Sequence, residues 1–175
     1  AVDRAEEEST LAMRINGEAP GVMAEEAKRL GAAMIHYSTD YVFDGRGSQS
    51  WIEGDATGPL SVYGRTKLEG EQLVASTSKH LIFRTSWVYG ARGGNFAKTM
   101  LRLASERDSL NVIDDQVGAP TSAELLADVT AHAVRTALQK PEMAGLYHCA
   151  ASGETSWHGY ARFVLGQAQA LGHTL

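Results

Sequence analysis

The chain has 175 residues, of which 43% are hydrophobic and 21% charged, and these are ordinary values for a packed globular protein. Its apolar stretches fall short of the ~20 residues that a membrane-crossing helix needs, and its acidic N-terminal segment differs from a secretory signal, so we expect a cytoplasmic protein without a membrane partner. A net charge of -5 gives no reason to expect nucleic acid as a partner, and the spacing of His, Cys and carboxylate residues predicts no zinc site.

Segments with helical and with strand patterns alternate along the chain, which is typical of a parallel α/β fold. A helix is predicted at residues 19–30, because Pro20 lies in its first turn and Gly31 follows its end. A strand at 33–38 and a long Gly-, Ser- and Asp-rich loop at 44–59 follow. The later predicted elements are helix 61–76, strand 80–85, helix 95–107, strand 110–113, helix 122–138, strand 146–149 and helix 157–171.

Tyr63 and Lys67 stand four residues apart within the predicted helix 61–76. Positions i and i+4 share one face of a helix, so the Lys67 ammonium can lie close to the phenol and favour its ionised form. A phenol with a lowered pKa can exchange protons near neutral pH, which a free phenol with a pKa near ~10 does poorly. The alternative to a catalytic pair is that Tyr63 is a half-buried packing residue and Lys67 a solvated surface charge, which is the more common case on an unrelated helix.

The predicted strand 33–38 is followed at once by small polar residues, Thr39 and Asp40. Loops at the carboxyl ends of parallel strands are where α/β sheets bind ligands. The Thr39 hydroxyl can either end the strand by bonding to its own backbone or contact a substrate carbonyl. Asp40 can likewise form an Asx turn or contact a sugar. His36 lies inside the strand and is interpreted as a satisfied interior histidine without a catalytic role.

Five strings of this sequence occur in an order that is known from one enzyme family: STDYVFDG, YGRTKLEGE, FRTSWVYG, NFAKTML and DDQVGAPT. Over essentially its whole length the chain resembles the extended short-chain dehydrogenase/reductases, and within them the dTDP-4-dehydrorhamnose reductases. The resemblance implies a Rossmann-like, doubly wound parallel sheet. It also implies an internal fragment, because the glycine-rich turn that holds a cofactor pyrophosphate is not among these residues. About 60 residues, at ~30 per βα unit, would precede the chain, and the end of a sugar-nucleotide lobe would follow it.

The same resemblance implies how the chain is divided. Residues 1–140 would form part of an NAD(P)-binding domain that carries the Tyr63 and Lys67 helix together with interleaved segments of the substrate lobe. Residues 141–175 would form part of the substrate-binding lobe itself. The full-length protein is expected to be a homodimer.

The activity that the resemblance implies is the NADPH- or NADH-dependent reduction of dTDP-4-dehydro-6-deoxy-L-mannose to dTDP-L-rhamnose. This reaction belongs to nucleotide-sugar and cell-surface polysaccharide biosynthesis, including that of O-antigen. Tyr63 would deliver a proton to the developing alkoxide, and Thr39 would hydrogen-bond the same oxygen. Lys67 would hold the nicotinamide ribose and lower the pKa of Tyr63. Magnesium is implied as an accessory ion, with no ligands assigned.

Two further residues, Trp87 and Arg84, can each be interpreted as structural or as part of the binding site. Trp87 follows the predicted strand 80–85, and the resemblance implies a contact to the sugar nucleotide, although a tryptophan there can also be core bulk. Arg84 can pair with a carboxylate inside the fold or with a phosphate. Asp40 joins Thr39 and Trp87 as an implied substrate contact.

Alternatives from other functional classes stay open. A non-catalytic regulatory relative would use the same cleft for binding, although the presence of Tyr63, Lys67 and Thr39 argues against it. An inactive fragment would self-associate through an exposed sheet edge and apolar surfaces. Among enzymes, an epimerase or a dehydratase shares the Tyr and Lys pair, but Thr39-Asp40-Tyr41 stands where a dehydratase would have Thr-Asp-Glu.

Overall fold

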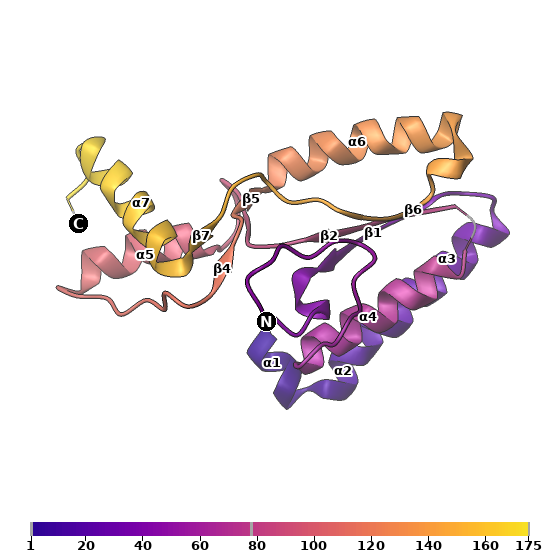
Figure 1. The fold of residues 1–175 in the computed structure, drawn as a ribbon, viewed down its shortest axis with the longest axis horizontal. Coiled ribbons are helices and arrows are strands. Elements are labelled where there is room, and N and C mark those ends of the chain that lie inside the picture. Colours follow the sequence, from indigo (N-terminus) through magenta and orange to yellow (C-terminus); the bar gives the residue numbers. More distant parts are fainter. Residues whose placement is uncertain (1, 78, 175) are drawn as a thin grey trace. The chain divides into compact units, whose positions relative to one another are not determined.

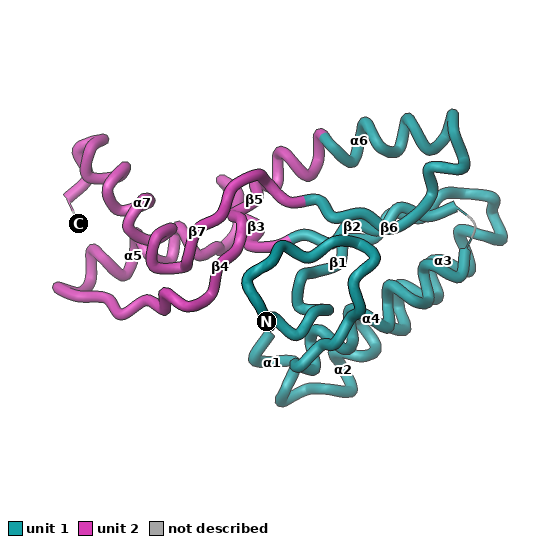
Figure 2. The backbone as a smooth tube through the Cα atoms, viewed as in Figure 1, with its two compact units in different colours: residues 1–85, 129–149 teal, residues 86–128, 150–175 magenta. Residues whose placement is uncertain are grey.

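A computed structural model describes residues 2–77 and 79–174 and divides the chain into two compact units (Figures 1 and 2). Unit 1 runs as far as Thr85 and includes Val129–Cys149, and unit 2 consists of Ser86–Asp128 and the residues from Ala150 onward. The functional division predicted at residue 140 concerns cofactor and substrate lobes and stays a prediction. None of the described helices combines the length and apolar character needed to cross a lipid bilayer.

A three-stranded parallel sheet forms the centre of unit 1. Its strands are β1 (Met34–Thr39), β2 (His80–Thr85) and β6 (Gly145–His148), in the order β1–β2–β6. The middle strand β2 has a continuous run of buried residues, as expected for a parallel strand covered on both faces. This sheet confirms the predicted α/β class and three of the four predicted strands.

One face of the sheet is covered through α4, against which the other N-terminal helices pack (Figure 1). The helices are α1 (Val2–Glu7), α2 (Ser9–Met13), α3 (Ala19–Arg29) and α4 (Val62–Ala75). The core between helices and sheet consists of the fully buried Ala24, Val74 and Ile82, with Met34 and Leu146 against them. Apolar burial between α3, α4 and the sheet therefore fixes the helix that carries Tyr63 and Lys67.

The other face is covered by α6 (Ala123–Gln139), most of which belongs to unit 1. Tyr37, Phe83 and Tyr147 lie side by side in the strand register on this face and form an aromatic row. Their ring centroids are 6.1 and 6.3 Å apart. The Tyr37 hydroxyl bonds to the Thr130 hydroxyl of α6 at 2.5 Å. Both faces of the parallel sheet are thus covered, as the fold class requires.

Helix α3 (Ala19–Arg29) matches the predicted helix 19–30, with Pro20 in its first turn, but the helical backbone that precedes it was not predicted. A π-helical turn, Arg14–Glu18, joins α2 directly to α3. Pro20 has no N–H to give to the carbonyl of Asn16, four residues earlier. That carbonyl instead lies against Gly70 of α4, where a methyl group would collide with it. The π-helical turn therefore accommodates Pro20 in the first turn of α3.

Unit 2 contains two short strand pairs and two helices. Its elements are β3 (Val88–Tyr89) paired with β5 (Thr121–Ser122), β4 (Val117–Gly118) paired with β7 (Thr155–Ser156), α5 (Phe96–Glu106) and α7 (Trp157–Ala170). Both helices were predicted. Asn95 and Ser156 cap them, since their side-chain oxygens accept the N–H groups of Lys98 and Gly159 at 3.1 and 3.0 Å.

The predicted strand at 110–113 is wrong. This segment pairs with no strand in the part of the chain that the structure describes, and the His158 N–H donates to the Ile113 carbonyl at 3.0 Å. Leu110 and Val112 line a cavity beside α7. A short apolar run fits a helix-facing loop as well as it fits a strand, so its pattern cannot separate the two.

Candidate active site

The start of α4 lies close against the turn that follows β1. The Ser61 hydroxyl caps the helix by accepting the Gly64 N–H at 3.0 Å. A carboxylate oxygen of Glu6 accepts the Val62 N–H at 2.7 Å. Gly64 permits the close approach, because a methyl group there would collide with the carbonyl oxygen of Tyr41. Tyr63, the residue before this glycine, is thereby placed beside the end of β1.

Thr39 and Asp40 form the turn itself. The Thr39 hydroxyl donates to Asp40 Oδ1 at 3.0 Å and accepts the Tyr41 N–H at 3.2 Å, so it caps the 3₁₀ turn Asp40–Val42. Burial raises the pKa of the Asp40 carboxyl, and the hydrogen bond from Thr39 opposes that rise. The backbone role considered for Thr39 is present in the structure. Its contact to a substrate oxygen stays a prediction.

The Tyr63 phenol is half-buried beside this turn. Its ring meets the Tyr41 ring edge to face, with centroids 5.6 Å apart. Burial raises the pKa of Tyr63; the hydrogen bond with Thr39 lowers it, and the charges of Asp40 and Tyr41 raise it further. The direction differs from the lowering that the spacing of Tyr63 and Lys67 led us to expect.

The physical reason lies in the place that the Lys67 ammonium takes. It donates to the Tyr37 carbonyl of β1 at 2.5 Å and lies 3.5 Å from His36 Nε2. Burial lowers the pKa of Lys67, and the nearby Glu71 carboxylate raises it. The positive charge of Lys67 is therefore directed to the backbone of β1. Burial of the Tyr63 ring, and not this charge, determines the direction in which the pKa of Tyr63 shifts.

A buried ion pair lies one turn further along α4. Arg84 of β2 donates to both carboxylate oxygens of Glu71, at 2.9 and 2.7 Å, and only 7% and 3% of the two side chains are exposed. The Arg84 guanidinium also lies 5.1 Å above the Phe43 ring. Of the two readings of Arg84, the carboxylate partner is confirmed. The sequence analysis did not single out Glu71. Its position four residues after Lys67, on the same face of the helix, could have indicated it.

His36 is an interior histidine, as predicted. It is 7% exposed, and burial together with the Lys67 charge lowers its pKa to about 4, while Glu71 opposes the shift. The imidazole is neutral at pH 7, and its Nε2 can accept from a neighbouring ammonium.

Trp87 belongs to unit 2, whereas the other predicted site residues belong to unit 1. Its indole stacks on that of Trp157, with ring centroids 3.5 Å apart. The Thr121 N–H donates to the Trp87 carbonyl at 3.3 Å. The string DDQVGAPT thus supplies β4 and the start of β5.

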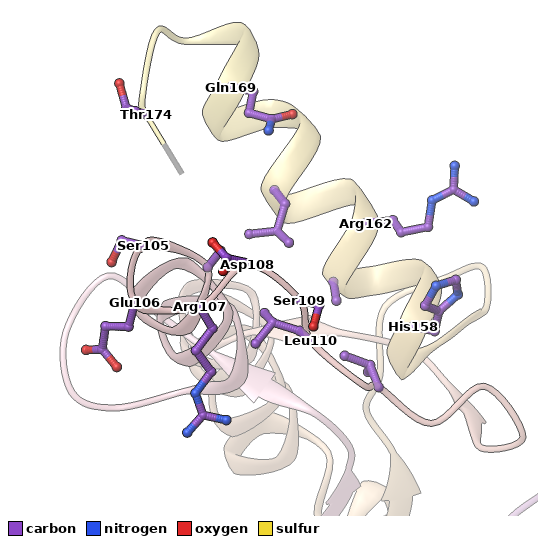
Figure 3. A pocket seen from close by; sticks show the side chains of 14 residues that line it. Ser105, Glu106, Arg107, Asp108, Ser109, Leu110, His158, Arg162, Gln169 and Thr174 are labelled. Carbon is purple, nitrogen blue, oxygen red and sulfur yellow. The ribbon is translucent and has the colours of Figure 1, made fainter.

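A cavity of about 730 Å³ lies in unit 2 between α7 and the end of α5 (Figure 3). It contains none of the predicted site residues. The guanidinium groups of Arg107 and Arg162 point away from it in Figure 3. We place the candidate site at the end of β1, where titratable groups converge, in preference to this open cavity. Among the described residues no three His, Cys, Asp or Glu side chains are grouped as metal ligands.

Comparisons with known proteins agree with the resemblance seen in the sequence. The family model described as "RmlD substrate binding domain" matches residues 1–175. The dTDP-4-dehydrorhamnose reductase of Salmonella typhimurium is 60% identical over 176 residues, which cover 100% of this chain and 59% of that protein. The spore coat polysaccharide biosynthesis protein SpsK of Bacillus subtilis is 41% identical over 96% of this chain and 58% of its own length.

Solved structures give the same result. A dTDP-4-dehydrorhamnose reductase from Clostridium acetobutylicum is 40% identical, with a TM-score of 0.90, and one from Bacillus anthracis in complex with NADP is 37% identical, also with 0.90. Each comparison covers 97% of this chain and 59% of the other, and these neighbours support the predicted Rossmann-like class. The chain spans about 59% of the length of the relatives that it matches, and over all of its own residues it belongs to the RmlD substrate binding domain family.

Proposed function

We propose that this chain supplies the catalytic residues of an NADPH- or NADH-dependent reductase, which converts dTDP-4-dehydro-6-deoxy-L-mannose to dTDP-L-rhamnose. The observation that carries the proposal is the placement of Tyr63 and Lys67 on one face of α4, beside Thr39 at the carboxyl end of β1. The proposal concerns the full-length protein, which we expect to be cytoplasmic and homodimeric. The names of the relatives support the substrate and the cofactor.

Tyr63 is suited to the role of proton donor. Its raised pKa keeps the phenol protonated at neutral pH but makes it a weaker acid than an ordinary phenol, so its position beside Thr39 is what suits it to the role. When bound, NADPH or NADH supplies the hydride. Tyr63 then passes its proton to the oxygen of the reduced carbonyl, and the Thr39 hydroxyl, now bonded to Asp40, would donate to that oxygen and stabilise its charge.

Lys67 is suited to holding the nicotinamide ribose. An ammonium group has three N–H donors, of which the Tyr37 carbonyl takes one and His36 Nε2 a weaker second. A third donor is left for a ribose hydroxyl.

Replacing the phenol tests the proposal. In the full-length protein Tyr63→Phe is expected to lower turnover at least ~100-fold, because the general acid is lost, while NADPH affinity changes little. Steady-state kinetics with dTDP-4-dehydro-6-deoxy-L-mannose and a binding titration with NADPH measure the two effects. Tyr147→Phe is the matched control, because that hydroxyl donates to the Met143 carbonyl on the opposite face of the sheet and should leave turnover unchanged.

Two outcomes would count against the proposal. Full turnover by Tyr63→Phe would remove Tyr63 from the mechanism. A full-length wild-type protein that binds the sugar nucleotide but turns over with neither cofactor would favour the non-catalytic alternative.

A further inference from the structure

Trp87 has a backbone conformation that tryptophan rarely adopts. Its φ is +48°, and among the described residues every other positive φ belongs to a glycine. For a bulky L-residue this left-handed conformation is strained and persists only where the surroundings enforce it. Trp87 stands between β2 and β3 and is only half-buried, so burial of its ring is not a sufficient reason for the strain.

Two neighbours in unit 2 enforce the position of the indole. Trp157, the first residue of α7, stacks on it nearly parallel, with centroids 3.5 Å apart and an angle of 11°. Gly118 of β4 lies against another side of the ring. A Cβ there would come within 2.6 Å of Trp87 Cε2 and 2.9 Å of Nε1, so residue 118 must be glycine if the indole is to keep its place.

Trp157 is itself in contact with Phe96, at the start of α5, and the two ring centroids are 4.5 Å apart. The Ser156 cap fixes the turn from which Trp157 begins α7. The orientation of Trp87 therefore depends on the packing of α5 and α7 and on the fact that Gly118 has no side chain.

We infer that Trp157 and Gly118 are positioning residues, which hold Trp87 in the orientation that the sugar nucleotide requires. The inference rests on the proposed function and on the sugar-nucleotide contact that the resemblance implies for Trp87. Backbone strain that neighbouring residues enforce is concentrated at ligand sites, because it fixes a side chain before the ligand arrives. An indole that serves only as core bulk could pack from an ordinary backbone conformation.

The test compares Trp157→Leu with Tyr160→Leu in the full-length protein. Both remove one ring from the same aromatic cluster, but Tyr160 contacts Phe96 and Tyr89, whereas Trp157 carries the stack on Trp87. Near-ultraviolet circular dichroism reports the stacked indole pair, and its exciton signal should vanish in Trp157→Leu and persist in Tyr160→Leu. Calorimetry with dTDP-L-rhamnose should show affinity at least about five-fold weaker in Trp157→Leu, and within about two-fold of wild type in Tyr160→Leu. The KM for NADPH should stay within about two-fold in both variants.

Two other variants keep the inference testable if Trp157→Leu fails to fold. Gly118→Ala pushes on the indole from β4 and should weaken dTDP-L-rhamnose binding in the same way, while Trp157→Phe, which retains a stacking ring, should recover most of the affinity. Loss of the exciton signal with unchanged affinity would overturn the inference, because Trp157 would then contribute only to packing and not to sugar-nucleotide binding. A wild-type protein that neither binds nor reduces the sugar nucleotide would refute the proposed function itself, and the inference with it. The wild-type measurement therefore separates the two failures.

Discussion

His36 is neutral at pH 7, because burial and the nearby Lys67 ammonium lower its pKa from an ordinary 6.5 to about 4, against the opposing charge of Glu71. In the unfolded chain the same imidazole would titrate at its ordinary pKa. As the pH falls from 6.5 towards 4, the unfolded chain binds this proton before the folded protein does. The free energy of unfolding should therefore decrease over that interval, by up to about 3 kcal/mol, and this contribution should be constant above pH 6.5.

Urea unfolding of the full-length protein at pH 7 and pH 4.5 measures this effect. His36→Asn removes the titrating group and should reduce the loss of stability between the two pH values. His132→Asn, which changes an exposed imidazole of α6, is the control and should behave as wild type. Asp40 has a raised pKa and works in the opposite direction, but it is common to all three proteins. An equal loss in all three would contradict the assignment.

The candidate site could be predicted from sequence only as far as its local spacing allows. Tyr63 and Lys67 share a face of α4 because that follows from helical geometry. The direction of the Lys67 side chain depends on the Tyr37 carbonyl, which β1 brings to it from 30 residues away. No pattern within the helix contains that carbonyl, so the shift in the pKa of Tyr63 was predicted with the wrong sign.

At the scale of elements, the Glu71 and Arg84 pair joins α4 to β2. Glu71→Gln would leave the Arg84 guanidinium buried without a counter-charge, so we expect a loss of about 3–5 kcal/mol in the free energy of unfolding. The matched control is Glu106→Gln, which breaks a pair with Arg102 whose side chains are 60% and 49% exposed, and it should cost less than about 1 kcal/mol. Denaturant unfolding of the full-length variants measures both. Equal effects would mean that the buried pair adds nothing beyond a surface contact.

The approach of α4 to the turn after β1 depends on Gly64. Gly64→Ala would bring a methyl group against the Tyr41 carbonyl, so we expect a loss of about 1–3 kcal/mol in stability and a lower turnover as Tyr63 moves away from Thr39. Gly166 lies inside α7 with open space at its Cβ position, and Gly166→Ala should instead gain up to about 1 kcal/mol of stability. Unfolding and steady-state kinetics of both full-length variants check the two signs. If Gly64→Ala changed neither the stability nor the turnover, then α4 could move away from the Tyr41 carbonyl without affecting the fold or the site.

Helices α4, α5, α6 and α7 were predictable because each carries a full helical pattern and, in three of them, a polar residue at its start: Ser61, Asn95 and Ser156. Strands β3, β4, β5 and β7 were not predicted, because two residues cannot show a period. The helical backbone before α3 was not predicted, for a different reason. Its π-helical turn depends on contacts with Gly70 and other residues of α4, which are distant in sequence.

At the scale of the whole molecule, the two units have different kinds of core. Unit 1 buries aliphatic side chains such as Val74 and Ile82 between a sheet and helices. Unit 2 is held by stacked rings, from Trp87 through Trp157 to Phe96, with only two-residue strands around them. Parallel pairing in unit 1 joins segments far apart in sequence, and its alternation of elements is what made the fold class predictable.

The alternative of a self-associating chain can be judged from surface that the structure leaves open. In the described residues β1 pairs with β2 on one side and is an edge strand on the other, where its backbone groups offer a template for pairing. On the helical segments of unit 1 and at the end of α3, Ile15, Val22 and Leu30 are 59%, 65% and 75% exposed. We therefore expect the 175-residue chain, purified alone, to form species larger than a dimer on size exclusion and to bind a hydrophobic dye, because apolar surface of this kind drives association. Val22→Lys should reduce both signals, since it places a charge among these side chains. A single species with the mass of one chain and no dye binding would show that this surface is tolerated in water, and the full-length protein would then not need it covered.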